Sequence, residues 1–336
     1  MGTRLEVLLP YTDRERGSML LRMMQNETER IEALLSVYRP ESEISMLNEM
    51  ASKAPVPVCR ETAQILTTCK AYYEQTSGAF DVAFGAMDEV QIDPAERTVF
   101  FTDEAVKLNF GGFGKGYALQ RMQKMLQSFG VIKAFVNFGD SAILAIGTHT
   151  SGEPWRVGPR DPEYAEKTLT AFDLQDASMS VSATIRNRRN PVAESRRNAP
   201  EVHRNASDVQ RNAPDVHRNA LDVQHTEPVS HLHTPSLPQH GSESITYPPA
   251  HQQHSGEPDR HASSQQVNRS ETRKFNPEPH PHIYDPAASG PVQCRRLVAV
   301  VDEDPLRAEI LSTALLVNPE LQTNLSTSNF YIKDYD

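Results

Sequence analysis

The chain contains short apolar or alternating runs bounded by turn residues, and longer stretches with apolar positions at helical spacing. The short runs predict strands at residues 5–9, 90–92, 98–101, 106–110, 134–138, 142–146, 155–157, 169–174 and 297–301. The longer stretches predict helices at residues 13–35, 61–75, 305–317 and from a glycine-rich turn at 111–116 to about residue 129. Because these elements mix without strict βαβ alternation, we expect an α+β fold.

The composition changes abruptly between residues 187 and 280. This segment holds 10 of the 12 histidines and 11 of the 24 prolines, but only two of the 23 aromatic residues. So few apolar side chains cannot offset the entropy of ordering the segment. A seven-residue repeat at 197–224 resembles a heptad, but its prolines oppose a coiled coil. We expect a disordered, low-complexity insertion at 187–280 that interrupts one large domain formed by residues 1–186 and 281–336. Its histidines could bind metal, although solvated filler is the simpler interpretation.

The charge balance limits the classes of function. Lys and Arg number 34 against 44 Asp and Glu, and the resulting net charge of −10 argues against a nucleic-acid binder, which needs a basic face. No apolar run reaches about 18 residues, so we expect no transmembrane helix. No signal-peptide pattern opens the chain, which as written favours the cytoplasm. The three cysteines form no CxxC pair, which argues against a disulfide framework or a zinc site.

The glycine-rich turn at 111–116 is the first candidate site. Glycines let a backbone approach a ligand closely, and the N-terminus of the following helix attracts phosphate. Lys115 would add a positive charge. The turn is not a P-loop, because Gly116 follows the lysine where Ser or Thr is required. An ordinary strand-to-helix turn explains the pattern equally well.

Three further constellations could carry chemistry. Glu309 and Thr313 lie four residues apart on a predicted helix, so their oxygens share one face and suit a hard cation such as Mg²⁺. A solvated helix face is the alternative. His282 precedes an Asp-Pro turn and could act as a general base, or serve only a structural role. Asn137, at the end of a predicted strand before Gly139, could expose backbone to a ligand, and an ordinary turn explains it as well.

Taken in order, these segments resemble the ApbE family of flavin transferases (FAD:protein FMN transferases). The resemblance covers nearly the whole chain outside the insertion. The matching segments are residues 1–3 (MGT), 36–48 (SVYRPESEISMLN), 78–82 (GAFDV), 108–118 (LNFGGFGKGYA), 154–162 (PWRVG followed by DP), 282–290 (HIYDPAASG) and 308–314 (AEILSTA). The resemblance implies an ApbE-like, T-fold-related domain.

The resemblance also implies a reaction and a site. Such an enzyme splits FAD with Mg²⁺, transfers FMN to a threonine or serine hydroxyl of a target flavoprotein, and releases AMP. The target would be a subunit of a redox-driven ion pump or another flavinylated electron-transfer protein. By resemblance, Glu309, Thr313 and a backbone carbonyl near Ser180 hold the metal, and His282 helps to deprotonate the acceptor hydroxyl. The residues expected to line the FAD site are Met1, Tyr38, Phe80, Asp81, Lys115 and Asn137.

The sequence departs from the family pattern at several of these positions. Glu309 stands where the family has aspartate, Gly139-Asp140-Ser141 replaces Gly-Gly-Asp, and Ser289 replaces threonine. Two other functions therefore stay open: Mg²⁺-dependent hydrolysis of FAD to FMN and AMP, and FAD binding without catalysis. The family commonly works in the cell envelope, which leaves the location of this chain open as well.

Overall fold

A computed structural model describes residues 3–164, 166–185, 283–285, 288, 290–324 and 329–335. Our expectation for the insertion at 187–280 lies outside the described residues. Met1 and His282 lie outside them as well. The described residues on both sides of the insertion belong to one compact unit and share one hydrophobic core.

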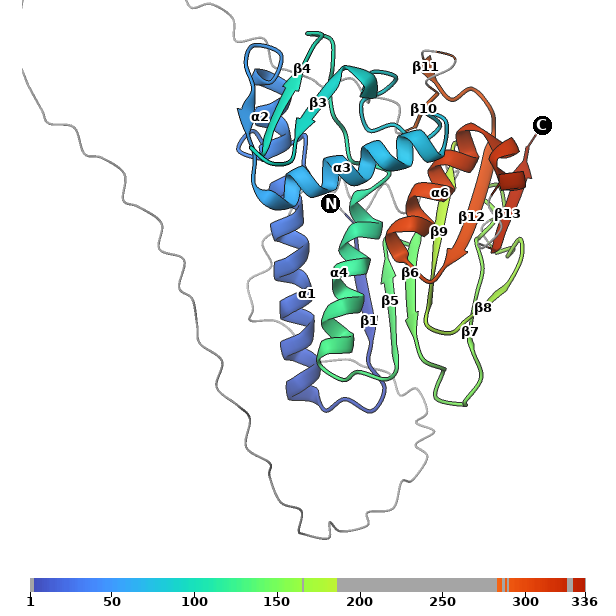
Figure 1. Ribbon diagram of the computed structural model, residues 1–336. Helices are drawn as coiled ribbons and strands as arrows, with labels where there is room; N and C mark the ends of the chain where they lie inside the picture. The colour runs from blue at the N-terminus through green and yellow to red at the C-terminus, as the bar shows by residue number, and fades with distance from the viewer. Residues whose placement is uncertain are drawn as a thin grey trace, which may run out of the picture. The chain divides into compact units, whose positions relative to one another are not determined.

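The centre of the fold is a six-stranded sheet in the order β1-β5-β6-β9-β12-β13, in which all neighbouring strands are antiparallel (Figure 1). The strands are β1 (Leu5–Leu8), β5 (Ala134–Phe138), β6 (Ala142–Ile146), β9 (Ala177–Ala183), β12 (Arg296–Asp302) and β13 (Asn329–Asp334). Strands β9 and β12 precede and follow the insertion in the sequence, yet they pair directly along their length. The insertion therefore interrupts a single sheet.

Three helices cover one face of this sheet (Figure 1): α1 (Arg14–Leu35), α4 (Gly114–Ser128) and α6 (Pro305–Val317). Helix α6 packs on β9 and β12, α4 packs on β6 and α6, and α1 packs on α4. Asp13 caps α1 by accepting the Arg16 N–H, and Asp304 caps α6 ahead of Pro305. Ten residues of α6 are buried, so this short helix forms the middle of the core.

The opposite face of the sheet carries a small second core. There the strands β7 (Trp155–Val157) and β8 (Phe172–Leu174) pair with each other. The Trp155 ring stacks on Phe135 of β5, with ring centroids 5.2 Å apart, and packs with Leu174 and Met179. Because side chains alternate along β5, Phe135 faces this cluster while its neighbours face the helices.

The remaining elements are smaller. Helices α2 (Glu43–Met50) and α3 (Arg60–Gln75) accompany a three-stranded sheet, β2-β4-β3, formed by β2 (Val56–Pro57), β4 (Thr98–Phe101) and β3 (Val90–Asp93). Strands β10 (Tyr284–Asp285) and β11 (Gly290–Pro291) form a short pair, and two 3₁₀ segments occur at Met87–Glu89 and Pro319–Asn324.

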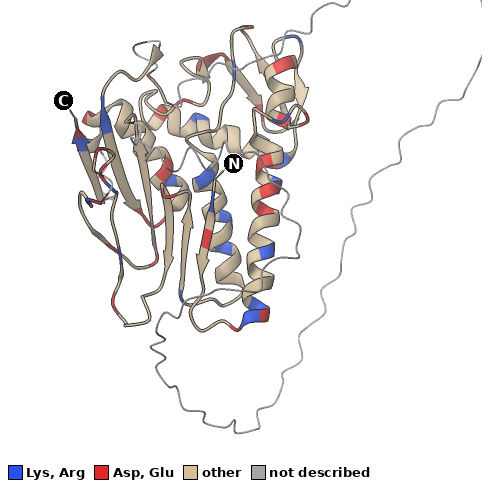
Figure 2. Ribbon diagram, turned by 180° about the vertical axis from the view of Figure 1, so that it is seen from behind, with Lys and Arg blue, Asp and Glu red and all other residues tan. Residues whose placement is uncertain are grey.

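Charged residues join the helices at their surfaces. Arg30 of α1 contacts both Glu27 and Glu61, the latter on α3, and Arg121 of α4 also contacts Glu27. The Tyr117 hydroxyl donates to Glu61 at 2.7 Å. Acidic and basic residues intersperse along α1 (Figure 2). Among the described helices, none combines the length and apolarity that a bilayer crossing requires.

The α+β expectation is confirmed, and most predicted elements occur where the sequence placed them. The strand predicted at 106–110 is wrong: its side chains alternate between buried and less buried, but its backbone pairs with the Asn48 side chain and with Val82 instead of a strand. Strand β8 begins at Phe172, not at residue 169. The predictions also missed α2 and β13.

Candidate functional site

The glycine-rich turn serves two purposes, and different glycines serve each. A Cβ on Gly116 would lie 2.7 Å from both Glu309 Cβ and the Pro305 carbonyl oxygen, and one on Gly112 would lie 2.9 Å from Thr313 Oγ1. These two glycines therefore allow α4 and α6 to approach closely. Gly111 and Gly114 instead line a cavity.

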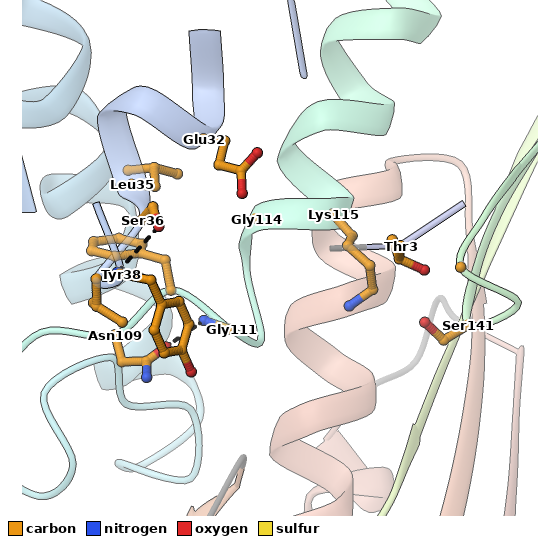
Figure 3. A pocket seen from close by; sticks show the side chains of 13 residues that line it. Thr3, Glu32, Leu35, Ser36, Tyr38, Asn109, Gly111, Gly114, Lys115 and Ser141 are labelled. Carbon is orange, nitrogen blue, oxygen red and sulfur yellow. Dashed lines mark hydrogen bonds between the residues drawn. The ribbon is translucent and has the colours of Figure 1, made fainter. Parts of the chain in front are cut away.

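The cavity lies beside the start of α4 and has a volume of about 440 Å³, which is within the range of small-molecule sites. Figure 3 shows Lys115 reaching into it from the first turn of α4, with Tyr38 and Asn109 on one side and Thr3 and Ser141 on the other. No side chain caps the N-terminus of α4. The cavity therefore combines an ammonium group with an uncapped helix N-terminus, and both favour an anion.

A buried carboxylate lies next to Lys115 of this cavity. Glu309 is 2% exposed, and its Oε1 accepts from Lys115 Nζ at 3.0 Å. Its Oε2 is buried and has no hydrogen-bond partner among the described residues. A buried carboxylate requires compensation for the lost hydration, and here only one of its two oxygens is compensated. The solvated-face interpretation of Glu309 is wrong, because α6 is enclosed by the sheet and α4.

A chain of hydroxyls joins α6 to β9 next to Glu309. Ser312 Oγ lies 3.1 Å from Ser180 Oγ and 2.9 Å from Ser182 Oγ, and it donates to the Glu309 carbonyl at 2.9 Å. Ser182 Oγ is 3.4 Å from Thr313 Oγ1. Lys115 and Glu309 are therefore in contact, and Ser180 and Thr313 are linked through Ser312 and Ser182. Of these residues only Lys115 lines the cavity. The metal-binding roles predicted for Glu309, Thr313 and Ser180 remain predictions.

Sequence reasoning did not assign site roles to Ser182 and Ser312. Their signal was available: Ser178, Ser180 and Ser182 alternate along β9, so they share one face of the strand. That face meets α6, where the buried Ser312 lies.

Of the residues predicted to line the flavin site, Tyr38 and Lys115 line the cavity, while Phe80, Asp81 and Asn137 do not. Asp81 instead folds its own loop by accepting the N–H groups of Ala83 and Gly85, both at 2.6 Å. Burial raises the pKa of Asp81, and these N–H groups oppose that rise. Phe80 is 2% exposed and belongs to the core.

Asn137 is held by its neighbours. Its Nδ2 donates to Glu6 Oε2 at 3.0 Å and to Asp140 Oδ1 at 2.9 Å, and its Oδ1 accepts the Asp140 N–H. This arrangement shapes the β5–β6 turn, whose Gly139 and Ser141 line the cavity. Asn137 therefore does not line the cavity itself but holds in place the turn that does.

The residues flanking the undescribed Met1 and His282 lie close to these elements. Thr3 lines the cavity. The Tyr284 ring meets Phe84 edge-on, with centroids 5.6 Å apart. Strand β10, just after His282, is thus packed against the loop that Asp81 folds. The role predicted for His282 remains a prediction.

The described residues fit a hard cation. Carboxylate and hydroxyl oxygens are the donors that Mg²⁺ prefers, and the free oxygen of Glu309 is a buried acceptor with an unmet demand for a positive partner. Lys115 already meets part of that demand. Among the described residues there is no cluster of three or more His, Cys, Asp or Glu side chains that could hold a metal. A cation here would therefore rely on Glu309 with hydroxyl or carbonyl oxygens.

Known proteins share this fold and parts of this sequence. The structure of the ApbE protein from Thermotoga maritima matches with a TM-score of 0.63 and 17% identity, covering 100% of this chain and 94% of that chain. The flavin transferase ApbE from Vibrio cholerae matches with a TM-score of 0.59 and 16% identity, with the same coverage.

Two curated relatives are named FAD:protein FMN transferase. The protein of Salmonella typhimurium is 25% identical over 220 residues, and that of Escherichia coli K12 is 26% identical over 220 residues. Each alignment covers 56% of this chain, which spans 63% of the first relative and 62% of the second. A model of the ApbE family matches residues 1–199, more than half of the chain. The chain belongs to the ApbE family.

Proposed function

We propose that this protein is a Mg²⁺-dependent FAD:protein FMN transferase. It would cleave FAD, attach FMN by a phosphoester bond to a threonine or serine of a target flavoprotein, and release AMP. The proposal rests on the ion pair between the partly exposed Lys115 and the buried Glu309, which joins an anion-attracting cavity to a carboxylate with one oxygen that has no partner among the described residues. The names of the curated relatives support the same activity.

The chain's own residues account for binding and orientation. Gly111 and Gly114 leave space for a diphosphate to approach the backbone at the start of α4. The Lys115 ammonium contributes positive charge at the same wall. Tyr38, which is 74% exposed, offers an aromatic surface at the cavity for a flavin or adenine ring.

Glu309 and Thr313 would hold the cation, with the oxygens of Ser180 close by. The cation would neutralise charge on the diphosphate, which phosphoryl transfer requires more than covalent chemistry by the protein. Ser312 and Ser182 would fix the Thr313 hydroxyl in place. His282 would accept the proton of the incoming hydroxyl.

The test is incubation with FAD, Mg²⁺ and a set of threonine- or serine-containing peptides, followed by peptide mass and nucleotide analysis. We expect one peptide to gain the mass of FMN less one water, with one AMP released per peptide labelled. A control without Mg²⁺ should show neither product. Free FMN and AMP with no labelled peptide would contradict the transferase and indicate a hydrolase.

The Lys115–Glu309 ion pair also favours a second candidate, a flavin-binding relative without catalysis. In that candidate the lysine replaces the cation as the partner of the carboxylate. Tight FAD binding, with FAD intact after long incubation with Mg²⁺ and every peptide, would support it over the transferase.

A further inference from the structure

A second cavity, of about 770 Å³, lies between α3, α4, the β3–β4 turn and the start of α6. Helix α3 contributes one face, from Arg60 to Tyr72, and α4 contributes positions from Phe113 to Lys124. It shares no lining residue with the cavity at Lys115. Nothing in the proposed transfer reaction uses it.

The lining of this cavity has the opposite charge to the chain. It contains the four cations Arg60, Arg97, Arg121 and Lys124, against a single carboxylate, Asp304. The chain as a whole has a net charge of −10. A positive cavity in an acidic protein concentrates positive potential at one place, where it can attract a negatively charged ligand.

Three of these cations form no ion pair with the residues that the structure describes. Arg121 pairs with Glu27, but no carboxylate of the described chain forms an ion pair with Arg60, Arg97 or Lys124. Asp304 is already engaged, because it accepts from Gln120 Nε2 at 2.9 Å and from the Leu306 N–H.

Two of the cations stand at positions where a basic or non-glycine residue is locally unfavourable. Arg60 is the first residue of α3, where the positive end of the helix dipole disfavours a cation. Arg97 has a φ of 54°, in the left-handed region of backbone conformation that residues other than glycine rarely adopt. Locally unfavourable choices of this kind concentrate at functional sites.

The arrangement of the lining indicates the class of ligand. The four cations are exposed and come from three separate elements, while Ala63 and Phe113 are buried beneath them. The thirteen residues from Arg60 to Tyr72 span about 18 Å of helix, the length of about five residues of extended peptide. Cations from three elements, set beside so long a helix face, suit a ligand that carries several negative charges along an extended chain. We propose that this cavity binds an acidic polypeptide segment of a protein partner.

The test is a fluorescence-anisotropy titration of the full-length protein with a labelled ten-residue peptide of alternating glutamate and alanine. The same peptide with glutamine in place of glutamate is the ligand control. The reporting variant is Arg97→Glu with Lys124→Glu, which breaks no described ion pair. Its matched control is Arg14→Glu with Arg22→Glu, two exposed α1 cations without a described ion-pair partner. Both double variants change the net charge equally.

We expect the glutamate peptide to bind and the glutamine peptide not to bind. The reporting variant should weaken binding roughly tenfold or more, and the α1 variant by less than about threefold, because close charge pairs contribute more than distant screened ones. Arg97→Gln with Lys124→Gln should give an intermediate loss, and circular dichroism should show that all variants fold.

Three outcomes would overturn the proposal: no binding of the acidic peptide, equal losses in the two glutamate variants, or displacement by pyrophosphate at far lower concentration than by unlabelled peptide. The last would identify a compact-anion site. The titration contains neither FAD nor Mg²⁺, so its failure leaves the flavin transferase proposal untouched.

Discussion

Gly116→Ala tests whether the close approach of α4 and α6 builds the site. The added methyl would lie 2.7 Å from both the Pro305 carbonyl oxygen and Glu309 Cβ, well inside normal contact distance. Neither neighbour is the end of a flexible side chain, so α6 must shift. Overpacking of this kind costs about 1–3 kcal/mol, and it is opposed by the gain in helix propensity of about 1 kcal/mol.

Gly17→Ala is the matched control. Gly17 also lies in the first turns of a helix, but among the described residues a Cβ there would meet Thr12 Cγ2 alone, at an ordinary 3.9 Å. The two variants share the propensity gain, so the difference between their unfolding free energies isolates the overpacking, about 1–3 kcal/mol. Urea denaturation followed by circular dichroism and by the single tryptophan, Trp155, measures that difference.

The same variant should also lose activity. A shift of α6 moves Glu309 relative to Lys115, and displacements of about 1 Å can cost on the order of a hundredfold in rate. Unfolding free energies that agree within about 0.5 kcal/mol, near the limit of additivity, would refute the packing argument. Full turnover by a destabilised Gly116→Ala would refute the link to the site.

Three further predictions concern charge, hydroxyl and aromatic groups. Hydrogen bonds from Arg30 lower the pKa of Glu27 from 4.5 to about 2, so the stabilising contribution of Glu27 is present above pH 4.5 and lost as pH falls towards 2. Urea titrations over this range should show the unfolding free energy falling by about 1–2 kcal/mol, allowing for solvent screening. Glu27→Gln should not show this fall. Ser312→Ala should lower turnover several-fold and weaken Mg²⁺ dependence with little change in FAD affinity, because it frees the Ser182 and Ser180 hydroxyls; unchanged Mg²⁺ dependence would contradict this. Tyr38→Ala should raise the KM for FAD, because it removes a stacking free energy of about 1–3 kcal/mol, and it should change kcat less. An unchanged KM would exclude the ring from the flavin site.

Helix α6 was predictable because its local signals agree. Asp304 caps it, Pro305 suits its first turn, and its apolar residues lie all round, which is typical of a buried helix. The same apolar surroundings could have indicated that Glu309 is buried. Spacing alone could not, because residues four apart share a face whether that face meets water or the core.

Other features depend on contacts distant in sequence. Residues 106–110 have the alternation of a strand, but the Asn48 side chain brackets Leu108 from both its N–H and its carbonyl, so no strand ladder forms. Asp81 belongs to a motif that suggested ligand binding, yet its immediate partners are backbone N–H groups of its own loop. The partner of Lys115 is 194 positions away in the sequence, and no local pattern specifies that pairing.

Calorimetric titration of Mg²⁺ into the protein with FAD bound tests whether Glu309 holds the cation. Glu309→Gln is compared against Glu320→Gln, a change at an exposed residue beyond α6. We expect wild type and Glu320→Gln to bind the cation alike and Glu309→Gln to lose cation binding. Cation binding by Glu309→Gln with wild-type affinity would contradict this expectation.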